Sequence, residues 1–125
     1  MSKIINTENA PAPIGPYNQA VLAGNTLYVS GQIALIPNTD TIVLDNIEDE
    51  THQVMKNMGA ILEAAGADFS NVVKCSIFVS SMGDFARINA IYGEYFSVNP
   101  PARETVEVSC LPKNVNVEIS CIAVI

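Results

Sequence analysis

Charged side chains are scarce in this sequence, and tryptophan is absent. Of its 125 residues, 15% are charged and 49% are hydrophobic, whereas globular proteins average about 25% charged residues. A chain of this length has a large surface relative to its volume, and a monomer usually covers that surface with charge. We therefore expect one domain, residues 1–125, that hides part of its surface in a homo-oligomer.

Positively charged side chains are scarcer than negatively charged ones. Six Lys and Arg residues stand against thirteen Asp and Glu residues, which gives a net charge of −7, and Arg87 and Arg103 are the only arginines. Because nucleic acids and anionic membranes are bound through clustered positive charge, we expect neither as a partner. A small pocket built around a single arginine remains compatible with this composition.

The sequence also lacks the motifs of several kinds of site. Its cysteines, Cys75, Cys110 and Cys121, are odd in number, widely spaced and without a C-x-x-C pair. This pattern disfavours a disulfide framework and a zinc site, and it predicts buried, reduced thiols. The first residues contain no apolar signal segment, and no run approaches the ~20 apolar residues of a membrane span. We therefore expect a cytoplasmic protein without a metal.

Apolar periodicity predicts an α+β fold in the order β-β-α-β-α-β-β. Strand patterns occur at residues 17–22, 26–33, 72–79, 102–110 and 116–124, with a further short strand near Ile4 and Ile5. Helical spacing occurs at residues 47–65 and 81–96. Asp45 should cap the first helix, with Glu48 three residues on, and Gly66 should follow its end.

Runs of strands combined with two helices favour a sheet that carries both helices on one face. The other face then needs cover as well, and association through the sheet would supply it. His52, the single histidine, should face solvent on the first predicted helix and have no catalytic role.

Two of the predicted strands carry polar side chains that could do chemistry. Because alternate residues of a strand share a face, Arg103, Thr105 and Glu107 should point the same way, as should Glu118 and Ser120. Buried charges persist only when they are paired, hydrogen-bonded or functional. Three interpretations of Glu118 therefore stay open: a solvated outer face, an ion pair with Arg103, or a functional carboxylate.

Segments along nearly the whole chain resemble the RidA (YjgF-type) family. In chain order they read NAPAPIGPY (9–17), VSGQI (29–33), EAAG (63–66), FARINAIY (85–92), PAR (101–103), VEV (106–108), LPK (111–113) and VEI (117–119). Several motifs in the same order are far more specific than any one of them. The resemblance implies a chorismate-mutase-like α+β domain with two helices on one face of a mixed sheet. It also implies a trimer with a central β-barrel and clefts between subunits.

The resemblance implies an activity as well. RidA-type members hydrolyse reactive 2-imino and enamine acids, which pyridoxal-phosphate dehydratases release, to 2-oxo acids and ammonia, without a metal or an organic cofactor. Three residues match catalytic positions: Arg103, which binds the substrate, Tyr17 in the pocket, and Glu118, which holds the water. The substrate-binding positions that match are Ser30, Gly31, Asn89 and Thr105, the last through its backbone.

Four features depart from the family pattern. Glu104 follows Arg103 where serine is usual, and a bulge at that point would bring its carboxylate near the bound substrate. Thr105 replaces a frequent cysteine, Ser120 replaces a common second glutamate, and the loop before Pro100 is short. These departures bear on the range of substrates more than on the reaction.

The sequence thus predicts a 2-iminobutanoate/2-iminopropanoate deaminase that acts as a homotrimer. Its link to pyridoxal-phosphate dehydratases would be functional and needs no physical contact. An alternative is a regulatory trimer of the same fold that binds small carboxylates without turnover. A third interpretation, an RNA-cleaving protein, fits poorly with the net charge of −7.

Overall fold

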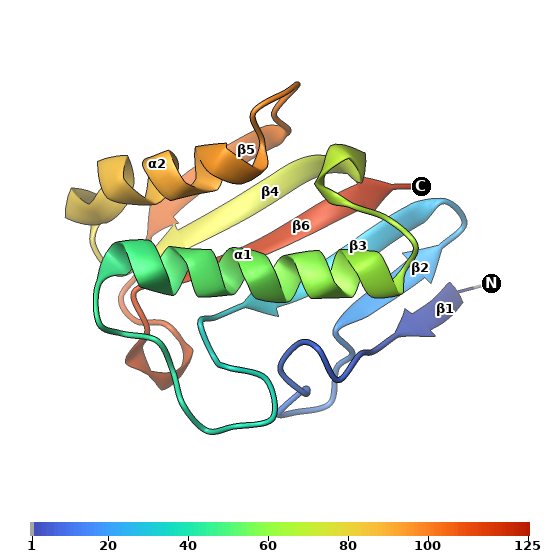
Figure 1. Ribbon diagram of the computed structural model, residues 1–125, viewed down its shortest axis with the longest axis horizontal. Coiled ribbons are helices and arrows are strands. Elements are labelled where there is room, and N and C mark those ends of the chain that lie inside the picture. Colours follow the sequence, from blue (N-terminus) through green and yellow to red (C-terminus); the bar gives the residue numbers. More distant parts are fainter. Residues whose placement is uncertain (1) are drawn as a thin grey trace.

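A computed structural model describes residues 2–125, in which six strands and two α-helices follow one another in the order β-β-β-α-β-α-β-β (Figure 1). The strands are β1 (Ser2–Ile5), β2 (Ala20–Ala23), β3 (Thr26–Gln32), β4 (Val72–Val79), β5 (Ala102–Glu107) and β6 (Val117–Val124). The α-helices are α1 (Ile47–Ala64) and α2 (Phe85–Tyr95). Three short 3₁₀ turns are η1 (Phe69–Asn71), η2 (Met82–Asp84) and η3 (Pro112–Asn114).

The strands form one mixed sheet in the order β1-β2-β3-β6-β4-β5. All neighbours are antiparallel except β4 and β5, which are parallel and joined through α2. Both helices cross the same face of the sheet (Figure 1). The predicted α+β fold with two helices on one sheet face is therefore confirmed, and β6 lies between the two parts of the sheet that precede it in the chain.

The core lies between the helices and the sheet. Helix α1 contributes a stripe of buried residues that includes Val54, Met58 and Ile61, and the central strands contribute Leu27 and Ile119. These side chains belong to one apolar cluster and are fully buried. Burial of an aliphatic side chain of this size stabilises a fold by about 1.5–3 kcal/mol, so the α1 stripe fixes the helix layer on the sheet.

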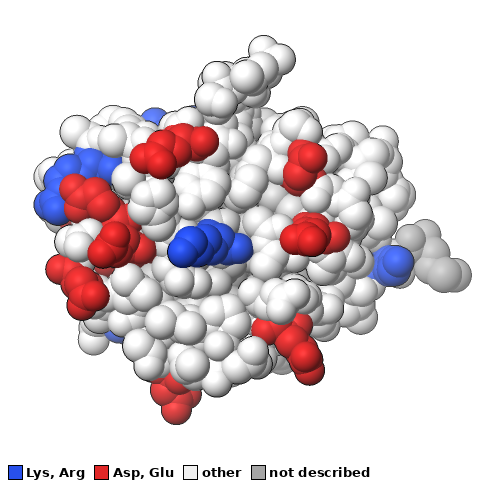
Figure 2. Space-filling view, in the orientation of Figure 1, with Lys and Arg blue, Asp and Glu red and all other residues white. Residues whose placement is uncertain are grey.

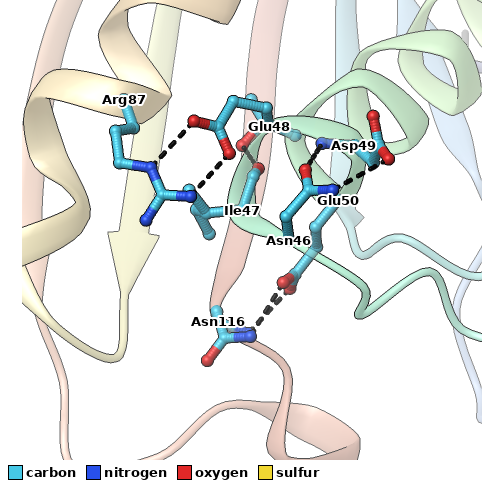
Figure 3. A network of polar contacts seen from close by, with 8 residues as sticks. Asn46, Ile47, Glu48, Asp49, Glu50, Arg87 and Asn116 are labelled. Carbon is cyan, nitrogen blue, oxygen red and sulfur yellow. Dashed lines mark hydrogen bonds and ion pairs between the residues drawn. The ribbon is translucent and has the colours of Figure 1, made fainter.

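The start of α1 differs from the prediction by one residue. Asn46, and not Asp45, is the N-cap, because its extended backbone lets Oδ1 accept a hydrogen bond from the Asp49 N–H at 2.8 Å. The Asn46 amide in turn donates to the Asp49 carboxylate at 3.0 Å (Figure 3). At the other end, Gly66 follows the helix with a φ of +78°, a conformation that favours glycine, as predicted.

Several predicted boundaries also shift. The strand expected at 17–22 begins only at Ala20, because residues before it belong to a loop that Gln19 holds through its side chain. Helix α2 begins at Phe85, after the short turn η2, and the strand from Ala102 ends at Glu107. The short strand expected near Ile4 is confirmed as β1.

The sheet face opposite the helices carries exposed apolar side chains. Ile4, Tyr28 and Val106 on this face are 59%, 50% and 42% exposed, respectively. They come from β1, β3 and β5, so the apolar surface extends across the sheet. An apolar surface of this kind is typical of an interface between subunits. We call this surface the open face.

Candidate functional site

Strand register places Arg103 and Glu118 on opposite faces of the sheet. Arg103 pairs with Cys75 of β4, which pairs with Cys121 of β6, and both cysteines are buried on the helix side. Glu118 instead pairs with Phe78, and both are an odd number of residues from the helix-side cysteines of their strands. Because successive residues of a strand point to opposite faces, Glu118 lies on the open face. The interpretation of Glu118 as an ion-pair partner of Arg103 is therefore wrong within one chain.

Helix α2 holds the Arg103 side chain on the helix side of the sheet. Nη1 of Arg103 donates to Oδ1 of Asn89 at 2.7 Å. The guanidinium carbon lies 5.0 Å from the ring centroid of Tyr92 and 5.5 Å from that of Phe85, within the range of cation–π attraction. Because positions 85, 89 and 92 share one face of a helix, α2 fixes one edge of the guanidinium. Within residues 2–125 its remaining N–H groups make no hydrogen bond and could bind a carboxylate.

Thr105 lies two residues beyond Arg103 on the same side of β5. Its hydroxyl oxygen is buried and has no hydrogen-bond partner among residues 2–125, and the same holds for the hydroxyl of Tyr92. Burial raises the pKa of Tyr92 far above its ordinary value, so this phenol stays protonated. Burial likewise raises the pKa of the neighbouring Cys75 thiol, which disfavours the reactive thiolate.

Glu118 lies in a separate cleft with a volume of about 400 Å³. The lining residues are Ile14, Tyr17, Ser30, Gly31, Ile33, Pro112 and Glu118. Glu118 is half-buried, and this burial raises the pKa of its carboxyl group. A general acid or base works best when its pKa lies near the operating pH, and the upward shift moves the pKa of Glu118 in that direction.

The Glu118 carboxylate lies against the backbone of Gly31, so a side chain at position 31 would displace this carboxylate from its place. A Cβ at this position would collide with Oε2 of Glu118 and lie 2.9 Å from its carboxyl carbon. The β3–β6 register shifts here, since Val29 pairs with Cys121 whereas Gln32 pairs with Ile119. A glycine inside an apolar strand is a known signal for such a bulge, and the sequence carried that signal.

The loop before β2 brings Tyr17 to the cleft. Its hydroxyl accepts a hydrogen bond from the Ile14 N–H at 3.4 Å, and the residue is 47% exposed. Ser30 ties this loop to β3, because its hydroxyl donates to the Asn18 carbonyl at 2.7 Å. Tyr17, Ser30, Gly31 and Glu118 therefore come together, whereas Arg103, Asn89 and Thr105 form a second group across the sheet.

Sequence reasoning missed Gln19 as the residue that holds the proline-rich loop before β2. Its side chain is almost fully buried and donates to the carbonyl groups of Thr7, Ala10 and Pro11 at 2.8–3.2 Å. It also accepts from the Thr7 N–H at 2.6 Å. The partners of Gln19 are backbone groups, which every residue carries. The sequence therefore carries no signal that this glutamine is buried or holds the loop.

The departure at Glu104 does not disturb the Arg103 side of the sheet. Strands β4 and β5 pair in regular register without a bulge, so Glu104 points to the open face. There it accepts a hydrogen bond from Ser76 and lies 2.9 Å from the Lys74 ammonium. The Ser76 hydrogen bond and the Lys74 charge lower the pKa of the Glu104 carboxyl group.

Two other sequence expectations need correction. His52 is partly buried and not fully solvated, because its Nδ1 lies 2.9 Å from the Tyr95 hydroxyl. Cys110 is exposed, although Cys75 and Cys121 are buried as expected, and all three thiols are unpaired.

Within residues 2–125, no helix combines the length and the apolar character needed to cross a membrane. The same part of the chain contains no cluster of three side chains suited to a metal ion. On the face that carries both helices, acidic side chains are spread widely and outnumber basic ones (Figure 2). This face therefore presents no continuous basic surface.

Comparisons with known proteins agree with this fold. A family model described as Endoribonuclease L-PSP matches residues 7–125. A RutC family protein from Synechocystis is 54% identical over 125 residues, which covers 98% of this chain and 96% of that protein. The human 2-iminobutanoate/2-iminopropanoate deaminase is 45% identical over 122 residues, covering 98% of this chain and 89% of that protein.

A solved structure gives the same result. A protein of unknown function from the conserved Rid family of Yersinia pestis has a TM-score of 0.97 and 44% identity, with the whole of both chains covered. This chain therefore belongs to the Endoribonuclease L-PSP family, of which the RidA (YjgF-type) proteins are members. The family predicted from the ordered motifs is confirmed.

Proposed function

We propose that this protein is a 2-iminobutanoate/2-iminopropanoate deaminase whose active site forms between two subunits of a homotrimer. The observation that carries the proposal is the division of Arg103 and Glu118 between two faces of one sheet. Glu118 lines a cleft and Arg103 is held by α2, so each is suited to one half of the reaction, and the two lie on opposite faces of the sheet within one chain. β5, which carries Arg103, is an edge strand of the sheet. Assembly that sets this edge of one subunit across the open face of the next would bring Arg103 of the first opposite Glu118 of the second.

Arg103 would bind the carboxylate that every 2-imino acid carries. A planar guanidinium can donate two parallel hydrogen bonds to a carboxylate and so fix the orientation of the whole molecule. The Asn89 side-chain oxygen accepts a hydrogen bond from Nη1 and so fixes the orientation of the guanidinium group. Thr105 follows on the same side of β5, where its backbone can contact the same ligand.

Glu118 would place and activate the water. The imine carbon is electrophilic, and its hydrolysis needs a water held on one side of it by a proton acceptor. The water oxygen bonds to the carbon of the protonated imine while Glu118 takes one water proton and the C=N electron pair moves to nitrogen, which gives a neutral carbinolamine. Glu118 then returns that proton to nitrogen. As the C–N bond breaks and ammonia leaves, Glu118 takes the proton of the hydroxyl group, and the carbonyl group of the 2-oxo acid forms. Tyr17 borders the same cleft and can hydrogen-bond the substrate.

The lining of the Glu118 cleft supports a short, uncharged substrate side chain. Ile14, Ile33 and Pro112 make its walls apolar. A second carboxylate on the substrate would approach Glu118 and be repelled. This supports the four-carbon and three-carbon imines over dicarboxylic ones. The chemistry needs no metal or organic cofactor, and pyridoxal-phosphate dehydratases would supply the imines.

A small-carboxylate-binding regulatory trimer is the second candidate. The observation in its favour is that the Arg103 group is formed by β5 and α2 alone, so a 2-oxo acid could be held without Glu118. The cleft around Glu118 favours the enzyme, because a binding module needs no half-buried carboxylate against Gly31.

The deciding experiment is an imine assay. A dehydratase releases 2-aminocrotonate or 2-aminoacrylate in the cuvette, and formation of 2-oxobutanoate or pyruvate is followed with and without this protein. We expect the protein to accelerate product formation and Arg103→Ala to abolish the acceleration. No acceleration, combined with binding of 2-oxobutanoate by calorimetry, would favour the regulatory trimer.

A further inference from the structure

A fully buried carboxylate stands in the first turn of α1, outside the residues that line the Glu118 cleft. Glu50 is 0% exposed, and none of the ion pairs among residues 2–125 includes it. Its two oxygens accept hydrogen bonds from a single residue, Asn116 (Figure 3). The backbone N–H donates to Oε2 and the side-chain amide donates to Oε1, each at 2.8 Å. A buried charge is costly unless such bonds compensate it.

Asn116 uses every one of its polar groups in this part of the molecule. In addition to its two bonds to Glu50, its carbonyl accepts from the Ser80 N–H at 3.1 Å. Its Oδ1 accepts from the Ser80 hydroxyl at 3.2 Å. Asn116 thereby joins the first turn of α1, the end of β4 and the start of β6.

This junction lies where the sheet gives β6 the least support. The β4–β6 ladder ends at the pair Val79–Val117, and the β3–β6 ladder ends at Gln32–Ile119 beyond the bulge. The preceding turn holds Lys113 at a positive φ of 54°, which is an unfavourable conformation for a residue with a side chain. The hydrogen bonds to Glu50 and Ser80 therefore determine where β6 begins.

From this geometry we infer that Glu50 is a positioning residue for Glu118. Through Asn116 it fixes the start of β6 two residues before Glu118, and thereby holds the Glu118 carboxylate against Gly31. The inference deepens the proposed function, on which its catalytic consequence rests.

A carboxylate suits this position better than an amide. Two donors of Asn116 converge on Glu50, and a carboxylate offers an acceptor oxygen to each. A glutamine offers one acceptor and one NH₂ group, which must face a donor of Asn116. Glu50→Gln therefore keeps the size of the side chain and removes one of its two hydrogen bonds.

The first experiment separates positioning of Glu118 from substrate binding. We expect Glu50→Gln to lower kcat for imine hydrolysis about tenfold, because small displacements of a catalytic group cost one to two decades in rate. The affinity for 2-oxobutanoate should stay within about twofold. The proposed ligand of this compound, Arg103, lies on β5, whereas the lost hydrogen bond to Asn116 affects the position of β6. Unchanged kcat, or equal loss of kcat and affinity, would contradict a positioning role.

A matched control stands in the same helical turn. Glu48 forms an exposed ion pair with Arg87, at 2.7 Å to its Nη2, and does not contact Asn116 (Figure 3). Exposed pairs contribute little, so Glu48→Gln should leave kcat and affinity unchanged. An equal effect of both substitutions would show a general response of the helix end and refute a specific role for Glu50.

A rescue variant guards against simple misfolding. In Glu50→Gln combined with Asn116→Asp, the glutamine amide can donate to the new carboxylate while its carbonyl accepts from the backbone N–H. The double variant should recover most of the lost kcat, whereas Asn116→Asp alone sets two carboxylates together and should lose it. Absence of rescue in a folded trimer of wild-type thermal stability would overturn the inference.

A readout without turnover tests Glu50 independently of the proposed reaction. The ¹³C carboxyl resonance of Glu118, assigned with Glu118→Gln, reports the titration of this group. Tyr17 is the other titratable side chain lining its cleft. When β6 is released, Glu118 gains water, so its pKa should fall toward the ordinary glutamate value in Glu50→Gln and stay unchanged in Glu48→Gln. An unchanged titration in Glu50→Gln refutes the inference, even if wild-type protein proves inactive on imines and the proposed function fails.

Discussion

At the scale of single residues, the proposed site combines two side chains with opposite environments. Arg103 lies between aromatic rings of α2 and keeps free donors beside its bond to Asn89. Glu118 is half-buried against Gly31 and forms no ion pair among residues 2–125. Arg103 is therefore suited to bind an anion, and Glu118 is suited to exchange a proton.

Arg103→Ala should abolish imine hydrolysis and leave the fold and assembly intact. Loss of one partner of a desolvated charge pair costs about 2–5 kcal/mol, which corresponds to about two to four decades in kcat/KM. Arg103→Lys should recover only part of the loss, because lysine keeps the charge but cannot donate two parallel bonds. Steady-state kinetics measure both, with Arg87→Ala as a control. Near-normal turnover in Arg103→Ala would place the carboxylate site elsewhere.

Glu118→Gln should reduce turnover while 2-oxobutanoate still binds. Glutamine keeps the size of the side chain but cannot exchange a proton, and loss of a general acid–base group costs about two to four decades. The signature of such a group is a fall in kcat with little change in ligand affinity. Tighter binding of 2-oxobutanoate with intact turnover would instead make Glu118 an ion-pair partner of Arg103 across subunits.

The same carboxylate predicts the direction of the pH dependence. Glu118 must be ionised to accept the proton of water, and its pKa is raised by burial. The ionised fraction is complete well above that raised pKa and is lost as the pH falls through it. Activity should therefore decline on the acid side at a pH above the ordinary glutamate value of about 4.3. A kcat/KM profile that stays flat down to that value would argue against Glu118 as the proton acceptor.

At the scale of elements, the strands could be found from the sequence, but their register could not. Alternation correctly groups Arg103 with Thr105 on β5, and Glu118 with Ser120 on β6. Whether the two groups share a face depends on the pairing through β4, which no local pattern encodes. The bulge at Gly31 was readable because glycine in a strand has few other reasons to occur.

The ends of elements were harder to predict for the same reason. Asp45 and Asn46 are both good caps, and only the backbone conformation selects Asn46. Residues 17–19 continue a strand-like pattern, but the buried side chain of Gln19 diverts the chain into a loop. The Glu50–Asn116 contact joins residues far apart in the sequence and left no trace in it.

Two glycines near helix ends should respond to alanine with opposite signs. Gly93 lies within α2, and a Cβ there meets no atom within 4 Å, so Gly93→Ala should stabilise the fold by about 0.5–1 kcal/mol. Gly66 has a φ of +78°, so Gly66→Ala should destabilise it by about 1 kcal/mol or more. Urea unfolding of both variants measures the difference. Equal effects would mean that the backbone at residue 66 relaxes at no cost.

At the scale of the whole molecule, the exposed apolar side chains of the open face predict that the protein assembles. These side chains include Tyr28 and Val106, both well exposed in the single chain. The Lys74–Glu104 ion pair lies on this face as well. A trimer formed through it would cover the apolar surface, and light scattering should give about three times the 13.4 kDa chain mass.

If the site is shared between subunits, as proposed, two inactive variants should complement each other. When Arg103→Ala and Glu118→Gln are denatured together and refolded, a site is intact if one subunit supplies the arginine and the next the glutamate. Random mixing should restore about one quarter of wild-type activity. Each variant refolded alone should stay inactive. No recovery in mixed trimers, verified by mass spectrometry, would mean that both residues act within one chain.

The position of β6 has a consequence for how the molecule is made. This strand follows all the others in chain order, yet it lies in the middle of the sheet between β3 and β4. During synthesis, β1, β2 and β3 can form one antiparallel ribbon, and β4 with β5 a parallel pair, but no strand pairing joins the two until β6 is available. Until then, β3 and β4 each present an unpaired edge that can capture strands of other chains. The nascent protein is therefore most prone to aggregation just before the strand that carries Glu118 leaves the ribosome.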